Sequence, residues 1–239
     1  MRYGRYGFSI RYCKFLPALL LIAALAAAPV TARAADRDPA APVSVGTSLI
    51  TIVALGDSLM AGYLLGPDED FASQLEAALK EAGHDNVKIA NAGVSGDTSS
   101  GGLARLDWAV GPDADAVILG LGANDALRAL NPAITRRNLD EIATRLKARG
   151  LPVLLAGMYA PPNLGAEYGG AFNPIYPELA ETHGLILYPF FLDGVAGERA
   201  LNLGDGIHPT AEGIGIIVGR ILPKVEELIA AVKNGDAVN

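Results

Sequence analysis

Ser58 has the sequence position expected of a nucleophile. It follows an apolar, β-rich run at residues 49–55 and stands on a turn led by Gly56. Its hydroxyl is therefore expected at the carboxyl end of a strand, where open α/β sheets place their working sites. A serine hydroxyl attacks a carbonyl group only when a neighbouring base takes its proton. Serine after glycine and aspartate is also a common turn or helix-capping residue, so the position alone does not assign the role.

His208 is the predicted base. The chain has three histidines, of which His84 lies in a polar turn and His183 at the expected carboxyl end of a helix. His208 instead follows Asp205 by three residues in a short loop, where a carboxylate can orient the imidazole and stabilise its protonated form. Ser58, Asp205 and His208 are therefore the predicted catalytic triad, and a purely structural hydrogen bond between Asp205 and His208 is the alternative.

Two further residues are expected at the same edge of the sheet. Gly93 and Asn124 follow the apolar runs at residues 87–91 and 116–120. The backbone N–H of Gly93 has no side chain in its way, and Asn124 can aim an amide N–H at the same point. Together with the N–H of Ser58 they are predicted to stabilise the oxyanion of a tetrahedral intermediate. A strand bulge at Gly93 and a loop-fixing hydrogen bond from Asn124 are the alternatives.

The elements that must position these residues alternate along the chain. Helical patterns separate short β-rich runs, as is typical of parallel strands joined by crossover helices. Five such runs occur, at residues 49–55, 87–91, 116–120, 152–157 and 185–188. An apolar stripe from Ile214 to Ile229 predicts a long closing helix across the sheet. Pro223 within it predicts a kink or a break near Leu222.

The first 34 residues have the features of an export signal. A basic start precedes an apolar run at residues 15–30, and Ala32 and Ala34 form the small-x-small pattern of a cleavage site. We expect residues 1–34 to be a cleaved signal peptide, which predicts a periplasmic or secreted protein without a stable membrane anchor; a retained anchor is the alternative. Residues 35–48 are then a flexible leader, 49–233 one catalytic domain and 234–239 a tail.

Charge and cysteine content narrow the function classes. Without residues 1–34 the chain keeps fourteen basic and twenty-six acidic residues, a net charge of −12. This balance argues against nucleic acid and anionic membranes as partners. The single cysteine, Cys13, would leave with the signal, so disulfides, thiolate metal sites and a cysteine nucleophile are not expected. No metal and no cofactor are predicted, and the protein is expected to be a monomer.

Four sequence motifs, in this order along the chain, resemble those of the SGNH (GDSL-type) hydrolase family. They are residues 56–59 (Gly-Asp-Ser-Leu), Gly93, residues 122–125 (Gly-Ala-Asn-Asp) and residues 205–209 (Asp-Gly-Ile-His-Pro). Carried over to this sequence, the resemblance assigns Ser58 as nucleophile, Gly93 and Asn124 as oxyanion donors, His208 as base and Asp205 as its orienting acid. These assignments agree with those made from the residues themselves.

Within that family, residues 55–63, 95–99 and 102–106 look like the bacterial thioesterase I, arylesterase and lysophospholipase subgroup. The resemblance implies a periplasmic esterase that hydrolyses small acyl esters and thioesters. It also implies an α/β fold of three αβα layers, flavodoxin-like, with a five-stranded parallel sheet of order 2-1-3-4-5. Ala123 departs from the subgroup, which often has glycine there. We expect the departure to affect loop packing or acyl preference and not the chemistry.

Substrate recognition is expected in the segment that follows the fourth apolar run. Tyr159, Pro161 and Leu164 are predicted to line an apolar acyl groove, and ordinary loop packing is the alternative. Such a groove would favour aryl esters or lysophospholipids over sugars. A polysaccharide O-acetyl esterase is the alternative enzyme. The alternative that is not an enzyme is a periplasmic binding protein on a fold of this family that has lost catalysis.

Overall fold

The computed structural model describes residues 48–235 of the 239-residue chain. The predicted signal peptide at residues 1–34 lies outside the described residues, as does most of the predicted leader and tail. Within the described part of the chain, no helix is both long and apolar enough to cross a membrane.

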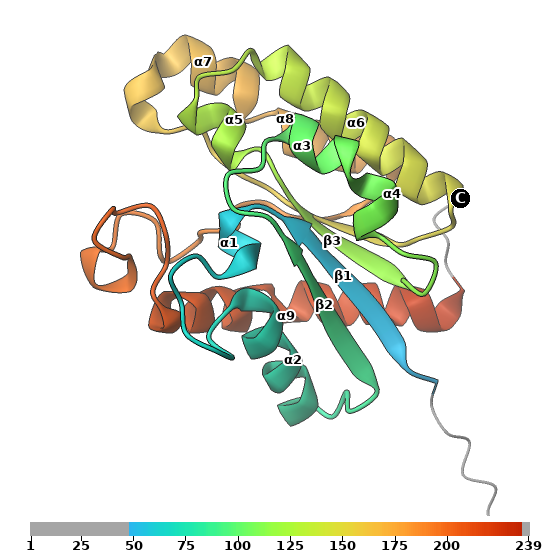
Figure 1. Cartoon of the computed structure of the whole chain (residues 1–239). Helices are drawn as coiled ribbons and strands as arrows, with labels where there is room; N and C mark the ends of the chain where they lie inside the picture. Colours follow the sequence, from blue (N-terminus) through green and yellow to red (C-terminus); the bar gives the residue numbers. More distant parts are fainter. Residues whose placement is uncertain (1–47, 236–239) are drawn as a thin grey trace, which may run out of the picture. The chain divides into compact units, whose positions relative to one another are not determined.

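The centre of the fold is a parallel sheet with the strand order β2-β1-β3-β4-β5 (Figure 1), which confirms the predicted fold. The strands are β1 (Ile50–Gly56), β2 (Val87–Gly93), β3 (Ala116–Gly120), β4 (Val153–Ala156) and β5 (Ile186–Tyr188). Because β1 lies between β2 and β3, the crossover from β1 to β2 and the crossover from β2 to β3 run in opposite directions across the sheet. Such a switch point opens a crevice at the carboxyl ends of the strands.

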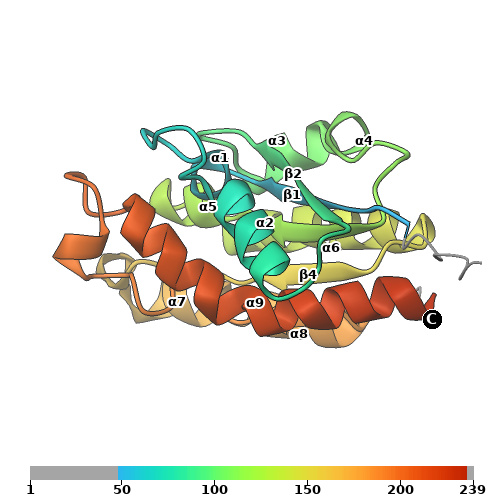
Figure 2. The same cartoon turned by 90° about the horizontal axis from the view of Figure 1, so that it is seen from below.

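Helices cover both faces of the sheet (Figures 1 and 2). One face carries α2 (Phe71–Glu81) and α9 (Ala211–Asn234), which pack against each other. The other carries α3 (Ser99–Ala104), α6 (Pro132–Ala148) and α8 (Ile175–His183). The shorter elements are α1 (Ser58–Ala61), α4 (Leu106–Ala109), α5 (Ala123–Leu127), α7 (Gly165–Phe172) and the 3₁₀ turns η1 (Pro162–Leu164) and η2 (Arg199–Leu201).

Burial on both faces explains the apolar character of the central strands. Ile52, Leu55, Ile118 and Leu154 have no exposed surface, and they lie on β1, β3 and β4. Strands covered by helices on both sides have near-continuous apolar sequences, unlike strands with one wet face. The same runs therefore identify the strands in the sequence and hold the sheet rigid beneath the loops at its carboxyl edge.

The closing helix α9 differs in one respect from the sequence prediction. It continues from Ala211 to Asn234 with Pro223 inside it, so of the kink or break expected near Leu222, the break does not occur. Proline in a helix interior costs roughly 3 kcal/mol through a lost hydrogen bond and a clash with the preceding turn. Buried Ile221 and Val225 anchor the helix to the core on both sides of the proline, which offsets that cost.

Candidate active site

Three side chains from distant parts of the chain form a hydrogen-bonded row at the carboxyl edge of the sheet. The Nε2 atom of His208 lies 2.9 Å from the hydroxyl oxygen of Ser58, and its Nδ1 atom lies 2.6 Å from Oδ2 of Asp205. With its proton on Nδ1, facing the carboxylate, the imidazole presents a free lone pair to the serine. This is the arrangement in which histidine can accept the serine proton.

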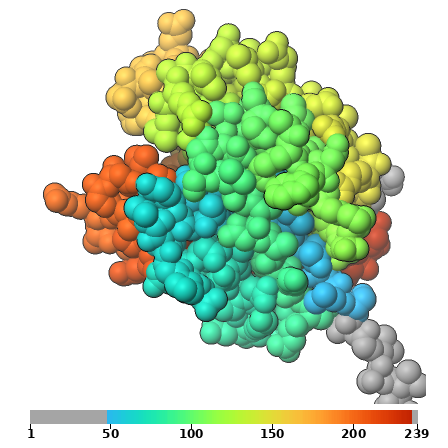
Figure 3. Space-filling view, viewed as in Figure 1, coloured from blue at the N-terminus to red at the C-terminus, as the bar shows by residue number. Residues whose placement is uncertain are grey.

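A short hairpin holds the loop that carries His208. The backbone of Asn202 forms an antiparallel bridge with Pro209, and the N–H of Leu203 donates to the carbonyl oxygen of His208 at 2.7 Å. The buried Asn202 side chain donates in turn to the carbonyl groups of Val195 and Glu198. The imidazole is thus presented by a fixed loop. Figure 3 shows this part of the chain, in orange, directly beside the cyan segment that follows β1.

Asp205 is held in the charged form, which is the form that can orient the imidazole of His208. Its Oδ1 atom accepts hydrogen bonds from the N–H groups of Ile207 (3.0 Å) and His208 (3.1 Å), while Oδ2 faces the imidazole. The Ile207 N–H, followed by the His208 side chain, lowers the pKa of Asp205 from 3.8 to about 2. Hydrogen bonds of this kind favour the carboxylate over the acid. Asp205 therefore remains negative throughout the neutral range.

The turn that presents Ser58 is set by its neighbours. Gly56 permits a close approach, since a Cβ atom there would lie 2.3 Å from Cγ of Met60 and 2.8 Å from the carbonyl oxygen of Gly120. Asp57 then caps α1 by accepting from the N–H of Leu59 at 3.0 Å. Ser58 is the first residue of α1, so its own N–H has no acceptor within the helix. That N–H is available to a ligand.

Comparison with known proteins identifies the family. The GDSL-like Lipase/Acylhydrolase family matches residues 54–215, which include the nucleophile turn and the loop with His208. The chain belongs to this family. It is therefore an enzyme, and its class is that of the carboxylic ester hydrolases.

Individual relatives agree with this placement. The chain is 40% identical over 162 residues to an arylesterase of Vibrio mimicus, covering 67% of this chain and 80% of the relative. It is 34% identical over 180 residues to thioesterase 1/protease 1/lysophospholipase L1 of Escherichia coli, covering 75% and 85%. Among solved structures, AlinE4, an SGNH-hydrolase family esterase, is 46% identical with a TM-score of 0.65, covering 77% of this chain and 98% of that one.

The predicted oxyanion donors Asn124 and Gly93 differ in whether an N–H remains free. The Asn124 side chain lies in the same pocket as Ser58 and His208, and its Nδ2 atom donates to Oδ2 of Asp57 at 3.4 Å, which leaves its second N–H free. The Gly93 N–H instead donates to Oδ1 of Asn91 at 2.9 Å, so it is not free for the role predicted from the sequence. Asn91 occupies this donor because its side chain reaches forward two residues along the chain.

The structure supplies another reason for a glycine at position 93. A Cβ atom there would lie 2.3 Å from the backbone nitrogen of Ala61 and 2.8 Å from the carbonyl carbon of Met60. Only glycine lets the end of β2 approach the backbone of α1 this closely. Gly93 is therefore a packing position next to the nucleophile helix.

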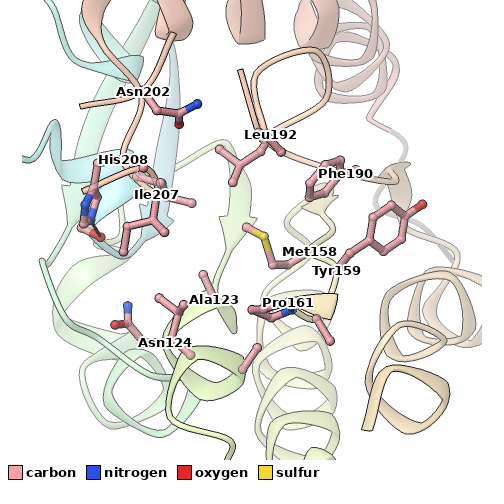
Figure 4. A pocket seen from close by; sticks show the side chains of 18 of the residues that line it. Ala123, Asn124, Met158, Tyr159, Pro161, Phe190, Leu192, Asn202, Ile207 and His208 are labelled. Carbon is pink, nitrogen blue, oxygen red and sulfur yellow. Dashed lines mark hydrogen bonds between the residues drawn. The ribbon is translucent and has the colours of Figure 1, made fainter. Parts of the chain in front are cut away.

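An apolar pocket of about 420 Å³ opens from Ser58. Figure 4 shows His208 and Asn124 at one end of this pocket and Tyr159 and Phe190 at the other. The rings of Tyr159 and Phe190 stack with their centroids 4.7 Å apart. The remaining lining between the two ends is mostly aliphatic and comes from five segments, with Leu127, Met158, Leu192 and Ile207 among its members.

Two of the three predicted substrate-binding residues lie in the pocket wall. Tyr159 and Pro161 line the pocket, but Leu164 does not, which corrects the prediction for that residue. The chain turns into the 3₁₀ segment η1 at Pro162 and ends it at Leu164, so Leu164 leaves the pocket wall. Phe190 and Leu192 were missed. Their signal in the sequence is the apolar stretch at residues 190–192, directly after β5 at the carboxyl edge of the sheet.

Of Tyr63, Trp108 and His183, only Tyr63 contacts the proposed triad. The ring of Tyr63 lies 4.5 Å from that of His208, centroid to centroid, with an angle of 36° between the ring planes. Trp108 is 83% exposed on α4, and His183 pairs with Asp140 at 2.6 Å. Among residues 48–235, no three His, Cys, Asp or Glu side chains come together as metal ligands.

Proposed function

We propose that this protein is a serine esterase that hydrolyses acyl esters through an acyl-serine intermediate. The observation that carries the proposal is the row of contacts from Asp205 to His208 to Ser58, at 2.6 and 2.9 Å, which ends at the mouth of an apolar pocket. This geometry joins a nucleophile, a base and an orienting acid in one line.

The proposed reaction proceeds in two halves. The Ser58 oxygen attacks the carbonyl carbon while its proton passes to Nε2 of His208. Collapse of the tetrahedral intermediate breaks the bond to the leaving group, which takes that proton from the imidazole. A water molecule, deprotonated by the same nitrogen, then attacks the acyl-serine. The bond between the acyl carbon and the Ser58 oxygen breaks, the acid leaves, and the imidazolium returns its proton to that oxygen. Asp205 stabilises the imidazolium in both halves.

The negative oxygen of each tetrahedral intermediate needs hydrogen-bond donors. We assign the N–H of Ser58 and one amide N–H of Asn124 to this role. Gly93 is already engaged with Asn91, but the N–H of Gly96, on the same loop after β2, has no acceptor among residues 48–235. We propose Gly96 as the third donor in place of Gly93. Loss of one such donor typically lowers kcat by about 10²- to 10³-fold.

The pocket favours an acyl chain as the group that it binds. Its walls are aliphatic and aromatic, with polar groups confined mainly to the catalytic end. Burying a methylene group stabilises a complex by about 0.8 kcal/mol, so each further carbon in the pocket adds affinity. Aryl esters, lysophospholipids and acyl thioesters combine an acyl chain with a leaving group at the mouth. The apolar walls favour these substrates over the O-acetyl sugars of a polysaccharide esterase.

A fluorophosphonate probe tests the proposal directly. It forms a covalent adduct with an activated serine, and mass spectrometry of the digested protein locates that adduct. We expect labelling of Ser58 together with turnover of p-nitrophenyl esters of graded chain length. Labelling of a different residue in active protein would refute the assignment. Loss of labelling in Ser58→Ala, but not in the exposed Ser100→Ala on α3, is the matched control.

Export and assembly are proposed on the sequence alone. We propose that residues 1–34 are removed during export, that the enzyme acts in the periplasm or outside the cell, and that it is a monomer. Amino-terminal sequencing of protein recovered from the periplasm is expected to begin at or near Ala35, and light scattering during gel filtration is expected to give a monomer mass. An amino terminus at Met1 would contradict the signal peptide.

A further inference from the structure

The carboxylate of Asp57 has no part in the reaction described above, although it adjoins the nucleophile. The residue is 1% exposed. Its Oδ1 atom accepts from the N–H of Leu59 at 3.0 Å, and its Oδ2 atom accepts from the Asn124 amide at 3.4 Å. Asparagine, serine or threonine would cap α1 as well as aspartate does, so capping alone does not explain a buried charge here.

The burial of this carboxylate is costly. Desolvation raises the pKa of Asp57 from 3.8 to about 6, and the hydrogen bonds from Leu59 and Asn124 only partly oppose it. Nearby ionisable groups also act on it: His208 favours its charged form and Asp125 disfavours it, while Tyr176 is buried near the same carboxylate. A neutral side chain of the same shape would avoid this cost. The carboxylate is therefore expected to have a role in the function of a neighbouring side chain at the pocket.

Asn124 presents a problem that a carboxylate can solve. The two ends of an asparagine amide have nearly the same shape, but only the nitrogen can donate a hydrogen bond. An oxyanion donor is useful only while that nitrogen faces the reacting carbonyl group. Among the described residues, the contact with Asp57 is the one hydrogen bond made by the Asn124 side chain. If the amide turned over, its oxygen would lie against the carboxylate oxygen and the two would repel each other.

We propose that Asp57 is a positioning residue that keeps the Nδ2 atom of Asn124 turned toward the oxyanion. One N–H of that nitrogen donates to Oδ2 of Asp57, and the other remains for the intermediate formed at Ser58. This inference rests on the proposed function, because it concerns the same oxyanion hole. It adds that the acid next to the nucleophile acts through Asn124 and does not touch the substrate.

The substitution Asp57→Asn separates this role from capping. Its amide oxygen is expected to stay with the Leu59 N–H, which has no other acceptor in the turn. Its NH₂ group then faces Asn124 and can be satisfied only by the Asn124 oxygen. The nearly isosteric change would therefore turn the Asn124 amide over and remove the donor. A residue that only capped the helix would tolerate the same change well.

The test compares steady-state hydrolysis of p-nitrophenyl butyrate by wild type, Asp57→Asn, Asn124→Ala and the double variant. We expect Asp57→Asn to lower kcat by about 10²- to 10³-fold, the usual effect of one lost oxyanion donor, with KM changed less than about threefold. The double variant should be no slower than Asn124→Ala. Asp115→Asn, which alters a carboxylate bonded to the Thr51 N–H at the other end of β1, should keep the wild-type rate.

A kcat of Asp57→Asn within about threefold of wild type would overturn the inference. So would a double variant whose fold-loss in kcat equals the product of the fold-losses of the two single variants. If Asp57→Asn does not fold, the acid limb of the wild-type kcat profile decides. The inference requires Asp57 to be ionised, so the acid limb should be steeper in wild type than in Asn124→Ala, where Asp57 has no amide to orient, and limbs of equal slope contradict it. A wild type with no esterase activity would instead refute the proposed function.

Discussion

The imidazole of His208 and the hydroxyl of Ser58 meet at 2.9 Å although 150 positions separate them in the chain. Ser58 is carried by the end of a central strand, and His208 by a hairpin loop just before the last helix. Neither segment depends on the other for its local geometry. The reaction centre therefore forms only once the sheet and α9 are packed together.

Replacing Ser58 by alanine is expected to lower kcat for p-nitrophenyl butyrate by about 10⁶-fold, because the nucleophile is lost while binding is kept. The unfolding temperature should change little, since the hydroxyl has one side-chain partner, His208. Esterase assays and thermal unfolding followed by circular dichroism check both statements. Retained activity together with a large drop in unfolding temperature would make Ser58 a structural residue.

Most of the architecture could be predicted from the sequence, for a physical reason. Strands covered on both faces must be almost entirely apolar, so the runs containing Ile52, Ile118 and Leu154 stand out against the helices between them. The contact between Asp205 and His208 was equally accessible, because both residues come from one loop of four residues. Side chains that lie close in sequence leave few arrangements to consider.

Other features of the site depend on contacts that no local pattern encodes. Gly93 ends β2 and has a usable N–H, but only the folded structure shows that the side chain of Asn91, on the same strand, accepts from it. Phe190 and Leu192 line the pocket from an irregular segment, where apolar residues carry no periodic signal. The helix does not break near Leu222, where a kink or a break was predicted, because tertiary packing outweighs a local preference. Such residues are set by the surrounding structure more than by their neighbours in the chain.

Replacing Asp205 by asparagine is expected to lower kcat by about 10⁴-fold without displacing the loop. The amide oxygen can still accept from the N–H groups of Ile207 and His208, but its NH₂ group would then face Nδ1 of the imidazole. The ring must accept there and carry its proton on Nε2, so it cannot take the proton of Ser58. Steady-state kinetics checks the loss, and a variant within tenfold of wild type would contradict the assigned role.

The same variant gives a prediction for stability against pH. Because the pKa of Asp205 is lowered to about 2 in the folded state, the ionised form stabilises the fold at every pH above the ordinary value of 3.8. That contribution is lost as the pH falls from about 4 to about 2. The difference in unfolding temperature between wild type and Asp205→Asn should shrink as the pH falls below 4. A difference that grows in acid would contradict the lowered pKa.

Replacing Phe190 by alanine should shift substrate preference toward longer acyl chains. The ring stacks on Tyr159 at the end of the pocket away from His208, so its removal extends the space for the chain. Each methylene group that becomes buried should raise kcat/KM by about fourfold, equivalent to about 0.8 kcal/mol. The ratio of kcat/KM for decanoate and butyrate esters measures the shift. Trp108→Ala, at an exposed position on α4, should leave the ratio unchanged.

Replacing Gly93 by alanine distinguishes its packing role from the donor role predicted from the sequence. An alanine keeps the backbone N–H, but its Cβ atom would meet the Ala61 nitrogen at 2.3 Å, a contact that side-chain rotation cannot relieve. We expect a loss of about 1–3 kcal/mol in the free energy of unfolding, measured by urea denaturation, together with reduced kcat as α1 and Ser58 shift. Reduced kcat with unchanged stability would instead indicate that the Gly93 N–H leaves Asn91 during the reaction and binds the oxyanion. The packing account requires both quantities to fall together.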